Sequence, residues 1–322
     1  MGIRDFMETH YRHFNARETR EAAQAWVDHL EGGGKMFLAL AGAMSTGELG
    51  ISLASMIREK RVHAISVTGA NVEEDLYSLL ARPEYKLIPG YRDLTPRQET
   101  ELFESGLNRV TDVCIPERVM YQLDDWFKDE WKRTEEAGER RRPFEFVSAI
   151  IDSGVMERHY QNPPEHSWVL AAHEMKIPVW VPGWEDSTSG SSFASEIMRG
   201  FLKDHRTVKT GTEQLQEIGE WYRAQSKEGI PVGFFQIGGG IAGDFAICAV
   251  PMLIQDLKEK DIPFWSYFCQ IGDATTSYGS YSGAVPNEKI TWGKLGEKTP
   301  RFMIQSDASL VAPLIFGYVL DE

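Results

Sequence analysis

The sequence predicts an α/β protein with a Rossmann-like, doubly wound and mainly parallel sheet that carries helices on both faces. Its short apolar runs are nearly continuous rather than alternating, which is typical of strands buried on both faces of a parallel sheet. Helical stretches separate most of these runs, and this strand–helix–strand alternation favours right-handed crossovers. Loops rich in glycine, serine, threonine and aspartate follow six of the runs, where open parallel sheets bind their ligands.

The predicted elements follow one another along the chain. An amphipathic helix is predicted over 20–31, within an N-terminal helical extension that spans 1–35, and the glycines at 32–34 end it. Strands are predicted at 36–41, 63–67, 144–151, 177–181, 232–237, 263–270 and 301–305. Further helices are predicted at about 46–59, 71–82, 116–138, 165–175, 191–205, 212–228 and 243–259.

The stretch 115–143 differs from the rest of the chain. It is rich in charge and longer than an ordinary crossover, so we interpret it as a charged helical insertion. Neither an internal repeat nor a flexible linker interrupts the sequence. We therefore expect a single domain over residues 1–322.

The composition excludes several classes of function. The formal net charge of −14 argues against nucleic-acid binding, because DNA and RNA require a basic surface that displaces counterions. No apolar run is long enough to cross a bilayer, and the N-terminus lacks the apolar region of a signal peptide. The 3 cysteines and 8 histidines show no metal-binding spacing. We expect a cytoplasmic protein without a metal site and without nucleic-acid or membrane partners.

The polar loops after the predicted strands indicate a nucleotide or dinucleotide site. Glycine permits close approach of the backbone to a phosphate, and a following helix N-terminus adds its dipole. Gly238, Gly239 and Gly240, before a helix that starts near Ala242, form the best candidate cradle. No G-x-G-x-x-G or Walker A motif is present, so a simple tight turn stays open as the alternative for these glycines.

A second feature is the segment 287–294, in which Lys294 follows Trp292 and Glu288. A lysine must be uncharged to form an imine, and burial or nearby cations favour that form. An aromatic neighbour supplies an apolar wall and a cation–π contact for a cationic substrate. Glu288 is suited to hold an ammonium group. From the spacing alone, a surface cluster of paired charges is the stronger interpretation.

Taken together, these loops resemble the deoxyhypusine synthase family. The resemblance runs from about 36 to 317, with an interruption at 115–143. Its most specific motifs are VTGANVEEDL (67–76), the loop around Asp186, IGGG (237–240), P-x-E-x-x-x-W-G-K (286–294) and DASLVAPL (307–314).

The resemblance implies a chemistry and an assembly. Family members use NAD to take a hydride from spermidine, capture the resulting imine on a lysine, and pass the aminobutyl fragment to an acceptor amine. The acceptor is a lysine of the hypusine-bearing translation factor, or putrescine in the similar homospermidine synthases. Members are homotetramers built from tight dimers, with active sites at the dimer interface. The same partners, a polyamine and an acceptor amine, are expected here.

The resemblance also implies roles for individual residues. Lys294 would form the imine, and Glu288 and Trp292 would line the amine channel. Contacts to NAD would come from Ser45, Thr46, Gly47, Thr68, Gly69, Glu74, Asp186, Gly238, Gly239, Gly240, Asp273, Ala274, Ser282, Asp307 and Ala308.

The substrate-binding positions depart from the family pattern. Asp244 stands where members that make deoxyhypusine have histidine, Ser191 where they have aspartate, and Tyr278 and Tyr281 where they have acidic residues. Losing a carboxylate partner of a desolvated ammonium costs about a few kcal/mol. We therefore hypothesise a bacterial-type enzyme with a small amine acceptor. A polyamine oxidoreductase without transfer and a non-catalytic nucleotide-binding module remain alternatives.

Overall fold

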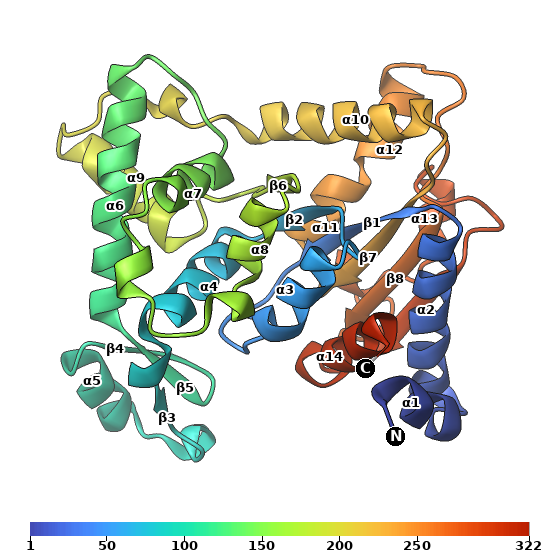
Figure 1. Ribbon diagram of the computed structural model, residues 1–322, viewed down its shortest axis with the longest axis horizontal. Coiled ribbons are helices and arrows are strands. Elements are labelled where there is room, and N and C mark those ends of the chain that lie inside the picture. Colours follow the sequence, from blue (N-terminus) through green and yellow to red (C-terminus); the bar gives the residue numbers. More distant parts are fainter. Residues whose placement is uncertain (322) are drawn as a thin grey trace.

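A six-stranded sheet organises the protein, as the computed structural model, which describes residues 1–321, shows in Figure 1. Its order is β6-β2-β1-β7-β8-β9, and every pairing within it is parallel. The strands are β1 (Lys35–Leu40), β2 (Ala64–Val67), β6 (Val179–Trp180), β7 (Val232–Ile237), β8 (Tyr267–Gly272) and β9 (Arg301–Gln305). Along the chain this is the 3-2-1-4-5-6 order of doubly wound dinucleotide-binding sheets. The predicted fold class is confirmed.

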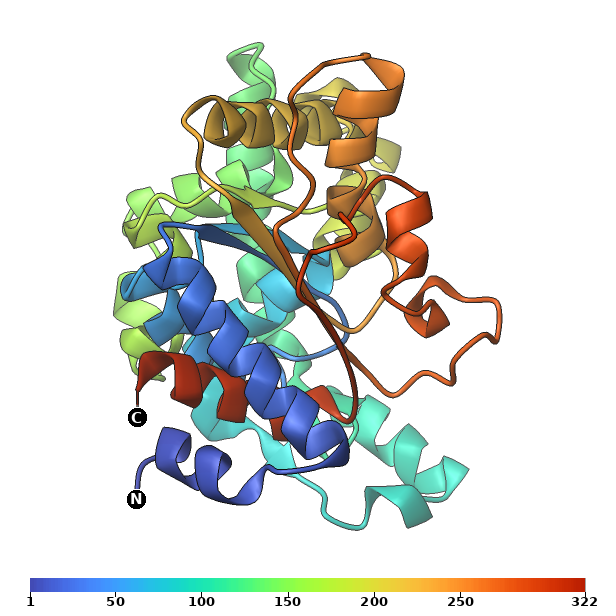
Figure 2. The same cartoon turned by 90° about the vertical axis from the view of Figure 1, so that its right-hand side faces the viewer.

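Helices cover both faces of the sheet (Figure 2). Alternate residues of β1 divide between two cores: Leu38 and Leu40 join one core, and Phe37 and Ala39 join the other. The first core includes α2 (Phe14–Glu31), α3 (Gly50–Arg58), α8 (Trp168–Glu174) and α14 (Ala308–Leu320). The second includes α10 (Gly211–Lys227), α11 (Ile241–Ile247) and α12 (Ala249–Pro251).

Most of the predicted strands are confirmed, but one is wrong. Residues 144–151 form α7 (Pro143–Asp152) instead of a strand. Phe144, Val147 and Ile150 are buried at a spacing of three residues, which is helical rather than extended. Pro143 is suited to the first helical turn, where a missing N–H is not needed. The strand predicted at 263–270 begins and ends later, as β8.

The sequence analysis missed a small antiparallel unit. β3 (Lys86–Leu87), β5 (Val113–Pro116) and β4 (Leu107–Val110) pair in that order beside α5 (Pro96–Glu104), at the lower left of Figure 1. Two helices were also not assigned bounds, α1 (Ile3–His10) and the C-terminal α14. α1 and α2 occupy the first 31 residues and both contact α14.

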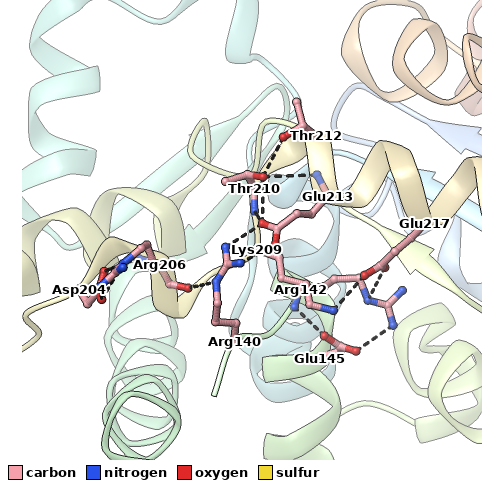
Figure 3. A network of polar contacts seen from close by, with 10 residues as sticks. All are labelled: Arg140, Arg142, Glu145, Asp204, Arg206, Lys209, Thr210, Thr212, Glu213 and Glu217. Atoms are coloured by element: carbon pink, nitrogen blue, oxygen red, sulfur yellow. Dashed lines mark hydrogen bonds and ion pairs between the residues drawn. The ribbon is translucent and has the colours of Figure 1, made fainter. Parts of the chain in front are cut away.

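The charged stretch 115–143 contains α6 (Glu117–Glu136), which contributes to the main core. Leu123, Phe127 and Trp131 are buried in it, and the helix contacts α4 (Gly69–Ala81), α7 and α9 (Thr188–Met198). The arginines that follow α6 bind carboxylates rather than pointing freely into solvent. Figure 3 shows Arg140 paired with Glu213 at the start of α10, and Arg142 paired with carboxylates of α7 and α10. This network joins the end of the stretch to two neighbouring helices.

Candidate active site

Lys294 lies at a cavity of about 590 Å³ between α11–α12, the loop 277–284 and α13 (Glu288–Thr291). Its side chain is only 9% exposed, and its Nζ donates a hydrogen bond of 2.8 Å to Oδ1 of Asp244. Asp244 is 47% exposed and belongs to the first turn of α11. Lys294 therefore lines the cavity as a buried amine that is hydrogen-bonded to a carboxylate.

The backbone around Gly293 directs Lys294 inward. Gly293 has a φ of +67°, and a Cβ there would come within 2.7 Å of Nε2 of Gln255. That amide donates a hydrogen bond of 3.1 Å to the carbonyl of Trp292. Gln255 belongs to a single π-helical turn, Met252–Asp256, a form of turn that is common at functional sites. Only glycine fits this position without strain, which gives the W-G-K pattern a local structural reason.

Aromatic side chains and a carboxylate surround the mouth and wall of the cavity. Trp292 is 66% exposed, and Glu288 lies on the surface at the same cavity. The ring of Tyr281 lies 5.2 Å from Nζ of Lys294. The hydroxyl of Tyr281 donates a hydrogen bond of 3.3 Å to Oε1 of Gln236. Burial raises the pKa of Tyr281, so this wall is a neutral phenol that can face a cation.

A second lysine at this cavity was missed by the sequence analysis. Lys289 is 2% exposed, and among the described residues its Nζ has no hydrogen-bond partner. The Nζ lies 4.7 Å from the ring centres of both Phe268 and Tyr281. Burial, and then the charge of Lys294, lowers the pKa of Lys289 to about 8. No pattern within α13 indicates this burial, because β8 and the loop before α13 supply the two rings.

The three glycines after β7 form an open turn beside the loop after β8. Gly238 and Gly240 have φ values of +73° and +71°. A Cβ at Gly239 would collide with the side chain of Ser282, whereas a Cβ at Gly240 would meet no atom within 4 Å. The turn thus combines close backbone packing with open space in front of Gly240. The structure thus places Ser282, another of the expected cofactor contacts, against these glycines.

The loops after β1 and β2 are joined by hydrogen bonds. The N–H of Ser45 donates to Oδ1 of Asn71 at 3.0 Å, and Nδ2 of Asn71 donates to Oγ1 of Thr68 at 2.8 Å. Gly69 begins α4 next to Ser187, and Gly47 lies in the same turn as Ser45. Asn71 was not singled out from the sequence, although its place in a helix-starting motif is typical of such side chains.

Three successive acidic residues of α4 bind three different segments. Glu73 accepts hydrogen bonds from the N–H groups of Thr188 and Ser189 at the start of α9. Glu74 accepts one of 3.3 Å from the N–H of Thr46. Asp75 accepts from the first backbone N–H groups of α8. Burial raises the pKa of both Glu74 and Asp75 to about 7, partly offset by these donors. Glu73 and Asp75 therefore hold helices, and Glu74 holds the predicted cofactor loop.

The remaining predicted residues lie in two places. Asp307 caps α14 by accepting a hydrogen bond of 2.8 Å from the N–H of Ser309, and Ala308 begins that helix. Asp273 and Ala274 directly follow β8, whose end is bonded to the end of β9. Asp186 and Ser191 are different, because both line a separate polar cavity of about 650 Å³. Ser191 is not one of the described residues that line the Lys294 cavity in this chain.

The residues present fit a dinucleotide. β1 and β7 are neighbours whose following helices lie on opposite faces of the sheet, and ligands of such sheets bind at this switch point. The loops that follow these two strands hold the open turn at Gly240 and the buried Oγ1 of Thr46, which has no hydrogen-bond partner within the described part of the chain. Within residues 1–321, no group of three potential metal ligands gathers. None of the helices described is long and apolar enough to span a bilayer.

Comparisons with known proteins agree along the chain. A model of the deoxyhypusine synthase family matches residues 5–319. The "Probable deoxyhypusine synthase 2" of Methanosarcina mazei is 25% identical over 303 residues, which cover 94% of this chain and 81% of that protein. The "Deoxyhypusine synthase-like protein" of a Cyanothece species is 26% identical, and the alignment covers 100% of this chain and 80% of that protein.

Solved structures share the fold. An Entamoeba histolytica protein provisionally named a deoxyhypusine synthase aligns with a TM-score of 0.58 at 12% identity, over 100% of this chain and 94% of its own. The complex of AgrE with ornithine and NAD+ aligns with a TM-score of 0.52 at 9% identity, over 95% of this chain and 33% of that one. At identities this low, the likeness concerns the arrangement of the backbone.

Proposed function

Because the chain belongs to the deoxyhypusine synthase family, we propose that it is an NAD-dependent transferase that carries the aminobutyl group of spermidine, or the matching fragment of a related amine, on Lys294. The observation that carries this proposal is the buried amine of Lys294 at a cavity, 2.8 Å from one carboxylate. The geometry supports a lysine that reacts, since an exposed lysine would be charged and solvated.

The cofactor would be held by the loops after β1, β2, β6, β7, β8 and β9. Ser45, Thr46 and Glu74 would act as one bonded unit, with the turn at Gly238, Gly239 and Gly240 opposite to it. The other contacts would come from Gly47, Thr68, Gly69, Asp186, Asp273, Ala274, Ser282, Asp307 and Ala308. NAD bound there would take up a hydride, whose loss oxidises the donor amine, and would return it to reduce the final imine.

The transfer itself would use the chain's own side chains. The uncharged amine of Lys294 attacks the oxidised carbon and forms an imine, and the remaining amine of the donor leaves, which is diaminopropane for spermidine. Oδ1 of Asp244 is within hydrogen-bond reach of the proton that Lys294 exchanges. Glu288 and Trp292 would hold the distal ammonium of the donor. An acceptor amine then displaces Lys294 and frees it for another turnover.

We propose a small amine as the acceptor, rather than a protein lysine. Asp244 already binds Lys294, so it is less available to a second ammonium. Tyr281 offers a ring rather than a charge, and Ser191 offers a neutral hydroxyl. The polar groups at these positions therefore differ from those of members that make deoxyhypusine, and this departure supports an acceptor other than the protein lysine. We further propose a cytoplasmic homotetramer. Its active site would be shared, because Ser191 and Asp186 line a cavity apart from that of Lys294.

Reductive trapping tests the lysine. The protein is incubated with NAD and isotope-labelled spermidine, reduced with borohydride, and digested for peptide mapping. Label on the Lys294 peptide supports the proposal. Lys294→Arg keeps a positive charge but cannot form an imine, so it should trap nothing, whereas the exposed control Lys298→Arg should trap as the wild type does. Oxidation of spermidine without any trapped label would favour an oxidoreductase instead.

A second experiment separates the acceptors. Putrescine, agmatine and a hypusine-factor homologue are each offered to the labelled protein. Release of label to putrescine or agmatine alone supports a small acceptor, and transfer to the protein factor contradicts it. Mixing Lys294→Arg with Asp186→Asn chains tests the shared site. Partial recovery of activity in the mixture requires that one site draws residues from two chains.

A further inference from the structure

Lys289 occupies an unusual position at the Lys294 cavity. It is 2% exposed, its Nζ has no hydrogen-bond partner among residues 1–321, and two aromatic rings lie 4.7 Å from the nitrogen. Ordinary lysines keep their ammonium in water and bury only the stem. A buried ammonium without a hydrogen bond is destabilising, and methionine would fill the same space without that penalty. Its burial therefore requires an explanation other than stability.

The backbone fixes Lys289 relative to Lys294. The carbonyl of Lys289 accepts hydrogen bonds from the N–H groups of Lys294 and Leu295, at 2.9 and 3.3 Å. Both ammonium groups face the ring of Tyr281, at 4.7 and 5.2 Å from its centre, so the two nitrogens are within about 10 Å of each other. At this range two like charges in a protein interior repel appreciably. The repulsion acts on both lysines, because the protonation of two interacting groups is coupled.

The charges that face the two lysines come from few elements. Asp244 on α11 and Glu288 on α13 are the carboxylates that line this cavity, and Asp244 accepts a hydrogen bond from Lys294. Burial raises the pKa of Cys248, and also that of Tyr281, so a neutral thiol and a neutral phenol complete the surroundings. Burial and the charge of Lys294 lower the pKa of Lys289, and Asp244 and Glu288 oppose that effect.

We propose that Lys289 is a positioning residue whose buried charge counteracts Asp244 and thereby favours the uncharged, reactive form of Lys294. A carboxylate next to a lysine favours the ammonium, whereas a second cation disfavours it. The pair Asp244 and Lys289 thus sets how much free amine Lys294 presents near neutral pH. The catalytic meaning of this balance rests on the proposed function, but the balance itself is a property of the folded chain.

Chemical labelling measures that balance without substrate or NAD. The full-length protein is methylated with formaldehyde and cyanoborohydride at about pH 7, where Lys289 is charged, and the rate at which the Lys294 peptide is labelled is followed by mass spectrometry. In Lys289→Met this rate should fall roughly tenfold, because the charge that disfavours the ammonium form of Lys294 is gone. Lys289→Gln should do the same. Lys289→Arg keeps the charge and should keep the wild-type rate.

The exposed Lys298 serves as an internal reference in every sample. Its labelling rate should not change in any variant. An unchanged Lys294 labelling rate in both Lys289→Met and Lys289→Gln overturns the proposal. A wild-type protein that traps no spermidine adduct counts against the proposed function and leaves the labelling result standing. An adduct together with an unchanged labelling rate counts against the role of Lys289 alone.

Discussion

Replacing Lys289 with methionine should stabilise the fold near neutral pH. Burial and the charge of Lys294 lower the pKa of Lys289 from 10.5 to about 8. One pKa unit corresponds to about 1.4 kcal/mol, so charging this amine in the folded state costs roughly 3 kcal/mol. The contacts with Phe268 and Tyr281 return about 0.5–1 kcal/mol each. Lys289→Met removes both contributions, and the net gain is roughly 1–2 kcal/mol.

The sign of the pH dependence follows from the lowered pKa. Below about pH 8 the amine is charged in the folded and unfolded chains, and the full penalty applies. Between about 8 and 10.5 the folded chain loses its proton first, so the penalty shrinks as the pH rises. Above 10.5 the amine is neutral in both states, and the penalty is gone. The advantage of Lys289→Met should therefore decline as the pH rises through this interval.

Denaturation of the wild type and Lys289→Met at about pH 7 and about pH 10 tests this prediction. For a chain of 322 residues, 1 kcal/mol corresponds to about 1.5 °C in Tm, so we expect Lys289→Met to unfold about 2–3 °C higher at the lower pH. The surface control Lys298→Met should change stability by less than about 0.5 kcal/mol. A variant that is less stable than the wild type at neutral pH would refute the reasoning. A stability advantage over the wild type that is equal at both pH values would refute it as well.

Three further predictions concern the site loops. Gly293→Ala forces a Cβ into Gln255 at a φ of +67°, so trapping of the Lys294 adduct should fall about tenfold or more; an unchanged yield would mean that the turn does not aim the lysine. Asp244→Asn removes the anion beside Lys294, and labelling of Lys294 near neutral pH should become faster; slower labelling would contradict the assigned balance. Glu74→Gln removes a carboxyl whose pKa burial raises to about 7, which makes wild-type stability fall as the pH rises from about 4.5 to 7. The stability advantage of Glu74→Gln over the wild type should therefore grow by roughly 1–3 kcal/mol between about pH 5 and pH 8 in denaturation experiments. An advantage that is equal at both pH values would exclude this effect of the buried carboxyl.

Local sequence was sufficient for elements whose signal is itself local. β1, β7 and β9 lie within one residue of their predicted bounds, because each is a continuous apolar run next to a turn or a polar loop. Residues 144–151 misled the prediction because apolar residues also crowd between the buried positions of α7. The glycine turn and the turn before Lys294 use glycines with positive φ, and the sequence itself identifies those glycines.

The rest of the site depends on contacts between distant segments. The burial of Lys289 requires Phe268 from β8 and Tyr281 from the following loop. The pairing of Lys294 with Asp244 joins residues 50 positions apart. Likewise, Glu73 and Asp75 hold α9 and α8, each about 90 residues or more further along the chain. A pattern within one segment carries no information on such pairings, so the sequence identified the reactive lysine but not the charges that act on it.

Those charges link stability and reactivity at one position. Asp244 favours the ammonium form of Lys294, but an amine attacks carbon only when it is neutral. A second buried cation restores the neutral form. The same cation weakens the fold, because among residues 1–321 no hydrogen bond offsets its desolvation. Substitutions of Lys289 should therefore change stability and the reactivity of Lys294 in opposite directions. If Lys289→Met gained stability near neutral pH while Lys294 reacted as fast as before, the buried lysine would be a packing defect with no part in the site.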